Sequence, residues 1–349
     1  MHKIQSMGIV LVISLLGVYL FNILHLPVPW LLGPIFTVLI SQFFIKTHLY
    51  WPSTLRNFGL IIVGITIGQS FQLTVFSGMG WLIGIMLLLN IMIIIFSVLL
   101  AFGLVRVGEL SLKTALTCTV PGGLSQIVAF AEEEEGIDIT IVTYFHVVRV
   151  ITIVISIPLI LHAHAVADKK EAMLSFSSMM ALLLLILGSI VAARIGKKIK
   201  IPVSSFLSPV LFVIGLQLFS IEMPEVPNLF LNMAQLMIGA YIGQLLKPNM
   251  LKLGKRVLLL GIGTAIFLLL FTFVQGWMLT QMMKYSLSTS ILSTAAGGLD
   301  QMSLLASAIG ADVSIVTVFQ MFRILFVFIV VLPLLKVSCR YIDERNTNT

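Results

Sequence analysis

Long apolar segments fill most of the chain and constrain its fold more than any other feature. Only 10% of the 349 residues are charged, whereas soluble domains carry about 25%. A helix needs roughly 20 apolar residues to cross a bilayer. We therefore predict an all-α polytopic membrane protein with about ten transmembrane helices, and we exclude a soluble enzyme or a DNA-binding domain. The ten segments are approximately 7–24, 29–46, 57–77, 80–105, 138–162, 173–193, 203–220, 229–246, 256–280 and 312–336.

The charges and cysteines fit this assignment. The net charge of +7 comes from basic residues that stand in small groups at the ends of apolar segments, where they act as topology signals. The first segment resembles a secretory signal, but no small-residue cleavage site follows it, so we interpret it as the first span. Cys118 lies in an apolar segment and Cys339 in the polar tail, so no disulfide is implied.

Two further apolar segments, 111–131 and 286–308, are each interrupted by glycine. The first contains Pro121-Gly122-Gly123 and the second contains Gly297-Gly298. Backbone polar groups in hydrocarbon need partners, so a break at membrane depth is tolerated only where protein buries it or water lines it. Each arm is roughly 16 Å of helix, about half of a ~30 Å core. We predict two re-entrant hairpins whose tips reach the middle of the membrane.

The chain aligns with itself at an offset of 175 residues, which indicates an internal duplication. TVPGGLSQ (119–126) falls on TAAGGLDQ (294–301), and after a slip of one residue FHVVR (145–149) falls on FQMFR (319–323). Chance matching of apolar residues would not align Gly, Gln and Arg in order. We predict two membrane repeats, residues 1–172 and 173–349.

The distribution of basic residues predicts how the repeats are oriented. If both broken segments crossed the membrane, the basic clusters at 194–200 and 247–256 would lie on the wrong side. If both segments are re-entrant, most Lys and Arg residues face the cytoplasm. Five spans and one hairpin per repeat make an odd number of crossings. We therefore predict inverted repeats, with both termini in the cytoplasm.

Both hairpin tips carry groups suited to a small anion. Glycine permits close approach of a ligand, and the helix that begins near Leu124 directs amide N–H groups and a positive dipole end toward its tip. Arginines inside the spans need partners, and a guanidinium binds carboxylate in two-pronged fashion. The candidate substrate-binding residues are Thr119, Pro121, Gly122, Gly123, Ser125, Gln126 and Arg149 in the first repeat and Thr294, Gly297, Gly298, Asp300, Gln301 and Arg323 in the second.

Alternatives stay open for the charged members of this set. Arg149 and Arg323 either bind an anionic substrate, cap carbonyl groups at a hairpin break, or pair with Asp300. Asp300 stands where the first repeat has Ser125, which makes the two tips chemically unequal. Asp300 either binds a coupling ion, Na⁺ or H⁺, or forms a plain salt bridge with an arginine.

Four glycines and two glutamines also recur between the repeats, outside the hairpins. The glycines are suited to close helix packing. The glutamines either line the same cavity as the tips or form hydrogen bonds between helices. These residues are Gly64, Gly68, Gln69, Gly239, Gly243 and Gln244.

The tandem motifs carry a resemblance that covers essentially the whole chain. TVPGGLSQ with FHVVR and TAAGGLDQ with FQMFR resemble the AbrB family of bacterial membrane proteins, sometimes labelled ammonia monooxygenase. The resemblance implies an integral inner-membrane protein with a duplicated domain, and one member is linked to regulation of gene expression. The chain departs from the family pattern at Ala296, where members often have Pro, and at Gln126 and Gln301, where they often have Glu.

These observations lead to one expected function and one alternative. We expect a secondary transporter that moves a small anionic solute across the cytoplasmic membrane by alternating access around the two tips. The alternative is a membrane-embedded sensor that affects gene expression without transport. The chain has no metal-ligand or nucleophile–base pattern, so we expect no cofactor, no metal and no enzyme activity. The expected partners are the solute or an ion and the lipid bilayer, not nucleic acid; a homo-oligomer stays open.

Overall fold

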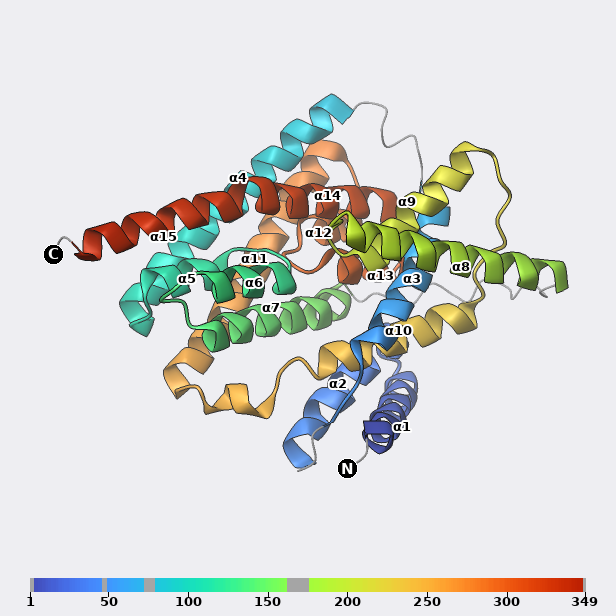
Figure 1. The fold of residues 1–349 in the computed structure, drawn as a ribbon, viewed down its shortest axis with the longest axis horizontal. Helices are drawn as coiled ribbons and strands as arrows, with labels where there is room; N and C mark the ends of the chain where they lie inside the picture. The colour runs from blue at the N-terminus through green and yellow to red at the C-terminus, as the bar shows by residue number, and fades with distance from the viewer. Residues whose placement is uncertain (1–2, 46–48, 72–78, 162–175, 348–349) are drawn as a thin grey trace. The chain divides into compact units, whose positions relative to one another are not determined.

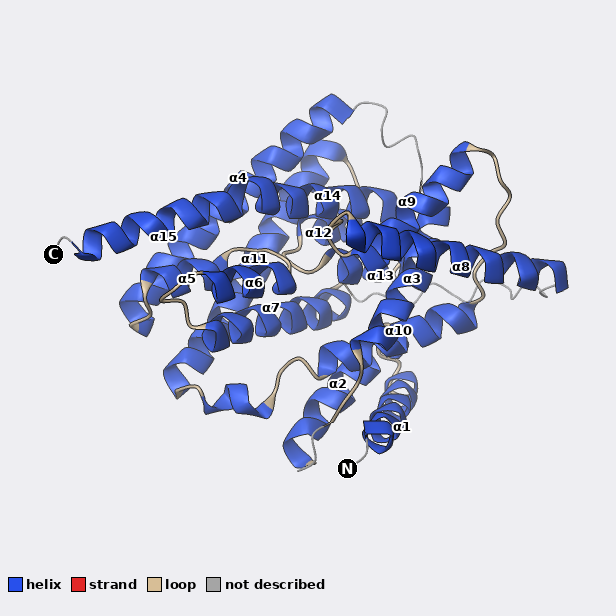
Figure 2. Cartoon of the chain, viewed as in Figure 1, coloured by secondary structure: helices blue, strands red, loops and turns tan. Residues whose placement is uncertain are grey.

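A computed structural model describes residues 3–45, 49–71, 79–161 and 176–347. Over these residues the chain is built of helices and connecting loops without strands (Figures 1 and 2). The fold class predicted from the apolar segments is therefore confirmed. The helices are α1 (Lys3–Ile23), α2 (Pro29–Phe44), α3 (Ser53–Ser70), α4 (Met79–Gly108), α5 (Leu112–Thr119), α6 (Leu124–Glu133), α7 (Ile139–Ile160), α8 (Phe176–Lys198), α9 (Ser204–Leu218), α10 (Asn228–Gly243), η2 (Pro248–Lys252), α11 (Lys255–Met283), α12 (Leu287–Thr294), α13 (Leu299–Ala308), α14 (Val313–Phe326), η3 (Val327–Val331) and α15 (Leu332–Thr347).

Each of the ten predicted apolar segments contains a helix. Seven candidate membrane spans are found among the described residues, and they involve α1, α4, α7, α8, α10, α11 and the continuous α14–η3–α15. Helices α2 and α9 are apolar but shorter, with 16 and 15 residues. Helix α3 has 18 residues and begins with the polar sequence STLRN. The protein is thus a multi-pass membrane protein in which three predicted spans are shorter or more polar than the rest.

The helices form two compact units, and each unit draws on both halves of the sequence. Unit 1 comprises residues 1–74, 157–245 and 303–314, and unit 2 comprises residues 75–156, 246–302 and 315–349. The predicted boundary between the repeats, at residues 172 and 173, lies outside the described residues. The spatial units therefore cut across the repeats, and the repeat boundary itself stays a prediction.

In unit 1, equivalent helices of the two halves pack in exchanged pairs. Helix α3 packs on α9, and α10 packs on α2. A Cβ atom at Gly64 would lie 2.7 Å from the carbonyl oxygen of Phe206, and one at Gly239 would lie 2.5 Å from that of Leu31. Because Leu31 and Phe206 are themselves equivalent, the contact is repeated with the halves exchanged. This reciprocity is what two copies related by a two-fold axis produce.

The recurring glycines and glutamines of unit 1 have structural roles. Glycine lets these helix backbones approach closely, so the packing interpretation of all four glycines is confirmed. Gln69 donates through Nε2 to the carbonyl of Pro224 at 2.8 Å, and Gln244 donates to that of Trp51 at 2.6 Å. Both glutamines therefore form hydrogen bonds to the other half, as in the hydrogen-bonding alternative, but their acceptors lie in loops and not on helices.

In unit 2, the short broken helices pack against the long apolar ones. Helix α5 packs on α4, α12 packs on α11, and α11 also contacts α4. Helix α12 can approach α11 closely because Gly276 of α11 has no side chain and lies directly against Ile291 of α12. All thirteen candidate site residues belong to unit 2, so the site is described within one compact unit.

Candidate functional site

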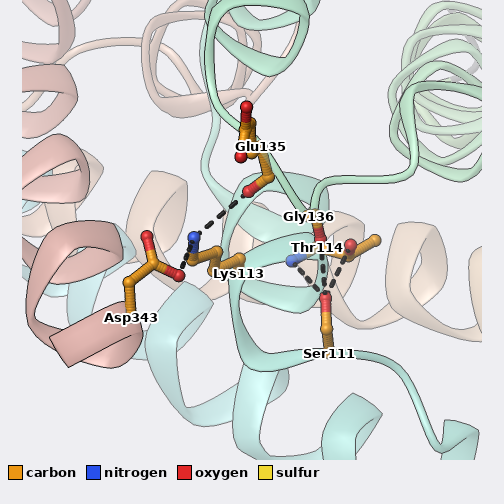
Figure 3. A network of polar contacts seen from close by, with 6 residues as sticks. All are labelled: Ser111, Lys113, Thr114, Glu135, Gly136 and Asp343. Atoms are coloured by element: carbon orange, nitrogen blue, oxygen red, sulfur yellow. Dashed lines mark hydrogen bonds and ion pairs between the residues drawn. The ribbon is translucent and has the colours of Figure 1, made fainter. Parts of the chain in front are cut away.

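The first broken segment is a hairpin that returns to its starting point. Helices α5 and α6 are separated by residues 120–123. At the base, the Ser111 hydroxyl donates to the Gly136 carbonyl at 3.3 Å and Lys113 Nζ donates to the Glu135 carbonyl at 3.1 Å (Figure 3). The Asp138 amide also donates to the hydroxyl of Thr114 at 3.2 Å. Because the chain before α5 meets the chain after α6, the segment forms a hairpin, as predicted.

The second broken segment repeats the local structure of the first. Helices α12 and α13 have 8 and 10 residues, the same lengths as α5 and α6. The hydroxyl of Ser286 caps α12 by accepting from the Thr289 amide at 3.2 Å, as Ser111 caps α5 by accepting from Thr114 at 3.2 Å. A side-chain oxygen at this position satisfies an amide that has no acceptor within the helix. Sequence duplication thus produces the same break and the same cap twice.

The break of the first hairpin is held by an arginine from the following helix. Arg149 of α7 donates through Nη1 to the carbonyl of Val120 and through Nη2 to that of Gly122, both at 3.1 Å. Only 2% of Arg149 is exposed. A broken helix leaves carbonyl groups without their usual amide donors, and the guanidinium supplies donors in a planar fork.

The second hairpin uses the equivalent arginine in the same way. Arg323 of α14 donates to the carbonyl groups of Ala295 and Gly297, the latter at 2.9 Å, and also to the side-chain oxygen of Gln320. The geometry of both arginines is therefore that of the carbonyl-capping alternative. The charges of Arg149 and Arg323 interact electrostatically, so the two breaks contribute to one buried region of unit 2, which also holds the buried carboxyl group of Asp300.

The threonines, Pro121 and Ser125 are considered first among the remaining tip residues. The hydroxyls of Thr119 and Thr294 donate to carbonyls of their own helices, at 3.2 Å to Ala115 and 3.0 Å to Ser290, so their donors are used locally. Pro121 is buried in the break, and Ser125 lies in the first turn of α6.

The glutamines at the tips differ from the threonines. The Oε1 atoms of Gln126 and Gln301 are buried and have no hydrogen-bond partner among the described residues. A Cβ at Gly298 would collide with Gln301 Oε1, whereas one at Gly123 would lie 3.3 Å from Gln126 Oε1. Gln301 can therefore occupy its position only because Gly298 has no side chain, whereas at Gly123 the contact would only be tight. Asp300 is 4% exposed and lies in the first turn of α13, where a negative charge is favourable.

A small cavity lies beside the second break. The centre of a water molecule can occupy about 10 Å³ of this cavity. The cavity therefore has room for about one water. Three of its polar residues were not predicted from the sequence, namely Asn90, Gln275 and Ser293, and Gln275 donates to the Leu89 carbonyl at 2.7 Å. The signal that could have found Asn90 and Gln275 is the occurrence of amide side chains inside long apolar spans. The residues that line the cavity are Leu89, Asn90, Ile93, Gln275, Ser293, Thr294, Phe319 and Arg323.

The base of the first hairpin is fastened to the C-terminal helix. Lys113 Nζ lies 2.5 Å from Asp343 Oδ1 of α15, and Figure 3 shows the Lys113 side chain directed toward both Asp343 and Glu135. The Lys113 side chain is 8% exposed and that of Asp343 is 58% exposed. The second half has Ser288 where the first has Lys113, so this ion pair belongs to the first hairpin alone.

Fold and site together define a class: polytopic, all-α membrane proteins with two glycine-broken helical segments, each held by an arginine. The family described as "Transition state regulatory protein AbrB" matches residues 30–338. The chain therefore belongs to the AbrB family, which confirms the resemblance carried by its tandem motifs.

Two bacterial proteins are relatives that match most of the chain. "Putative regulator AbrB" of Escherichia coli (strain K12) is 26% identical over 351 residues, which span 97% of this chain and 98% of that protein. "Uncharacterized protein YhjN" of Bacillus subtilis (strain 168) is 27% identical over 296 residues, which span 79% of this chain and 76% of that protein. No solved structure matches the chain.

Proposed function

We propose that this protein is a secondary transporter of a small anionic solute, with the substrate site at the two hairpin tips. The observation that carries the proposal is the pair of arginines, Arg149 and Arg323, buried beside two broken helices in one compact unit. Helices broken at membrane depth, with their termini directed at a site, are the arrangement used by secondary transporters built from inverted repeats.

The charges around the breaks favour an anion. Each guanidinium is held by neutral carbonyl groups, so its positive charge is solvated by dipoles but not neutralised by them. The N-termini of α6 and α13 add the positive ends of two helix dipoles. A carboxylate that entered the tip would accept hydrogen bonds from the guanidinium in two-pronged fashion.

Transport then follows from competition between the solute and the backbone. An anion that takes an arginine away from its carbonyl groups loosens the hairpin tip, and the tip is the part that moves in the transport cycle. At the second tip, Asp300 is buried in the first turn of α13, and we assign it to the coupling ion, Na⁺ or H⁺. We place the protein in the cytoplasmic membrane with both termini in the cytoplasm.

The alternative function, a membrane-embedded sensor, is favoured by the names of the family and of one relative, both of which refer to regulation. A sensor would bind its ligand at the same tips without moving it. The two functions differ in flux, not in binding.

The test separates these outcomes with the purified full-length protein. Thermal unfolding is first measured with acetate, lactate, oxalate, succinate, citrate, phosphate and sulfate, because a ligand stabilises the folded state in proportion to its saturation. The uptake of each radiolabelled anion that stabilises the protein is then measured in proteoliposomes with a pH or Na⁺ gradient. Transport requires uptake that is lost in Gly123→Leu and Arg323→Ala and retained in Arg106→Ala, which removes an exposed arginine at the end of α4. Stabilisation without uptake would identify a sensor, and no stabilisation by any of the anions would refute the anion site.

Topology offers an independent test of the geometry. A cysteine introduced at Glu132 should react with an impermeant thiol reagent only from the cytoplasmic side, because the hairpin returns to the side from which it entered. Reaction from the periplasmic side would contradict the re-entrant site and the function proposed for it.

A further inference from the structure

Two amide side chains meet at the small cavity beside the second break. Asn90 of α4 and Gln275 of α11 line this cavity together with Arg323 of α14. All three residues belong to unit 2, and their exposed fractions are 6%, 1% and 5%. Polar groups buried to this extent cost free energy unless they have partners. The hydrogen-bonding atoms of the walls therefore decide what the cavity can hold.

The nitrogen of each amide is already engaged. Asn90 Nδ2 donates to the Met86 carbonyl and Gln275 Nε2 donates to the Leu89 carbonyl, both at 2.7 Å. A carbonyl oxygen only accepts hydrogen bonds, so these contacts identify the nitrogen of each amide. The oxygen of each amide is then the atom that is left to accept a hydrogen bond from a ligand.

The two hydroxyl groups at the cavity are in the same state. Ser293 donates to the Thr289 carbonyl at 2.7 Å, and Thr294 donates to the Ser290 carbonyl at 3.0 Å, so both present oxygen lone pairs. Arg323, in contrast, has donors only. The walls therefore combine several acceptors with one charged donor. A group that fits them both donates and accepts a hydrogen bond, and it has the size of one water.

A hydroxyl group has these properties, and the other common groups of small solutes do not. A carboxylate or ketone oxygen accepts hydrogen bonds but cannot donate one. A methyl group does neither. An ammonium group donates, but the positive charge of Arg323 repels it. A hydroxyl that replaces a water in the cavity reproduces the hydrogen bonds of that water, so the exchange does not leave the walls unpaired.

We propose that the solute is a small hydroxycarboxylate whose carboxylate binds Arg323 at the second tip and whose hydroxyl enters the adjacent cavity and donates to Asn90 or Gln275. This inference deepens the proposed function and rests on it, because it begins from an anion bound at the tips. Asn90 and Gln275 are then the residues that determine which carboxylates the protein prefers.

The first tip does not offer the same subsite. At the offset of 175 residues that relates the repeats, Asn90 falls on Ala265 and Gln275 falls on Leu100. Neither of these side chains has a hydrogen-bonding atom. An arginine is present at both tips, but the pair of amides is present at the second alone, so the hydroxyl group is recognised at the second tip.

The expected preference follows from the strength of one hydrogen bond. A site whose buried polar groups fit a hydroxyl discriminates against an analogue that lacks it. The net contribution of an ordinary hydrogen bond corresponds to a preference of about two- to tenfold in the dissociation constant.

The test compares matched acids on the purified full-length protein by titration of thermal unfolding, since the stabilisation depends on the dissociation constant. Lactate is compared with propionate, which lacks the hydroxyl, with isobutyrate, which has a methyl in its place, and with alanine, which has an ammonium. Malate, succinate, methylsuccinate and aspartate form a second series of the same design. In at least one series, the hydroxy acid should bind about two- to tenfold more tightly than each of its analogues.

Two variants assign this preference to its residues. Asn90→Leu and Gln275→Met remove the amide oxygens with little change in side-chain volume. Both should reduce the preference for the hydroxy acid and leave the affinity for the analogue without a hydroxyl within about twofold of the parent value. The control is Gln217→Met in unit 1, which removes an amide that also donates to a backbone carbonyl, that of Gln69, at 3.0 Å. This variant should keep the preference.

The outcomes separate this inference from the function on which it rests. If the parent protein binds the analogues as tightly as the hydroxy acids, the hydroxyl subsite is overturned while the anion site stands. A preference that persists in both Asn90→Leu and Gln275→Met would overturn the assignment to these residues. Binding of none of the acids would refute the anion site and this inference with it. The comparison of acids needs the parent protein alone, so it remains decisive if a variant does not fold.

Discussion

Substitution of Gly276 by alanine should loosen the second hairpin. A Cβ at this position of α11 would lie 2.7 Å from Ile291 Cγ1 and 2.9 Å from Ile291 Cα. Because one of these atoms is backbone, a change of rotamer cannot relieve the contact, and α12 must move away from α11. Overpacking of this kind costs about 1–3 kcal/mol.

The matched control lies on the same helix. A Cβ at Gly263 would meet nothing within 4 Å, so Gly263→Ala changes helix propensity without a new contact. Both variants gain the same propensity, about 0.5–1 kcal/mol, which cancels in the comparison. Gly276→Ala should therefore be less stable than Gly263→Ala by about 1–3 kcal/mol.

The assay is equilibrium unfolding of the two variants in the same detergent, followed by solute uptake in proteoliposomes. The difference in unfolding free energy should be accompanied by reduced uptake for Gly276→Ala alone, since only this glycine contacts a hairpin arm. Equal stability of the two variants would refute the close packing of α11 on α12.

Three further changes test the arginine, the base and the cap of the first hairpin. Arg149→Lys keeps the charge but loses the planar fork, so one carbonyl of the break loses a charged donor. We expect the free energy of unfolding, measured by thermal or chemical unfolding, to fall by about 1.5–3 kcal/mol. Arg106→Lys should cause no measurable change. Lys113→Met removes a buried ammonium that joins the hairpin to α15 and should lower the free energy of unfolding by about 1–2 kcal/mol. The Lys336 side chain is 47% exposed, so Lys336→Met should lower it by only about 0–1 kcal/mol. Equal effects of the two variants would argue against a contact that holds the base of the hairpin to α15. Ser111→Ala removes the cap of α5 and should cost about 0.5–2 kcal/mol of unfolding free energy.

The membrane spans and the hairpins were predictable because their signals are local. A run of apolar residues fixes a helix wherever it lies in hydrocarbon, and Gly122 and Gly297 interrupt the helix within their own segments. The cap at Ser111 and the start of α6 at Leu124 are also local. The prediction that the first hairpin is re-entrant came from the positions of basic residues, which reflect the membrane rather than the packing.

The partners of the buried groups were not predictable in the same way. The sequence left Arg149 with three alternatives, because a guanidinium reaches any acceptor within several ångströms and the acceptors lie on other helices. Only the packing of α7 against α5 places it at the carbonyls of Val120 and Gly122. The contacts of His146 with the Thr117 carbonyl and of Gln320 with the Leu292 carbonyl were missed for the same reason, although both side chains stand in the motifs that revealed the duplication.

By itself, the sequence determined that this protein is a duplicated, helical membrane protein of the AbrB family with two interrupted segments, since hydrophobicity, glycine and repeated motifs act over short stretches of chain. The tertiary structure alone decided that each compact unit combines both halves and that Gly64 packs on Phe206 while Gly239 packs on Leu31. Such contacts join residues more than a hundred positions apart. They depend on how whole helices pack against one another, which local sequence patterns do not specify.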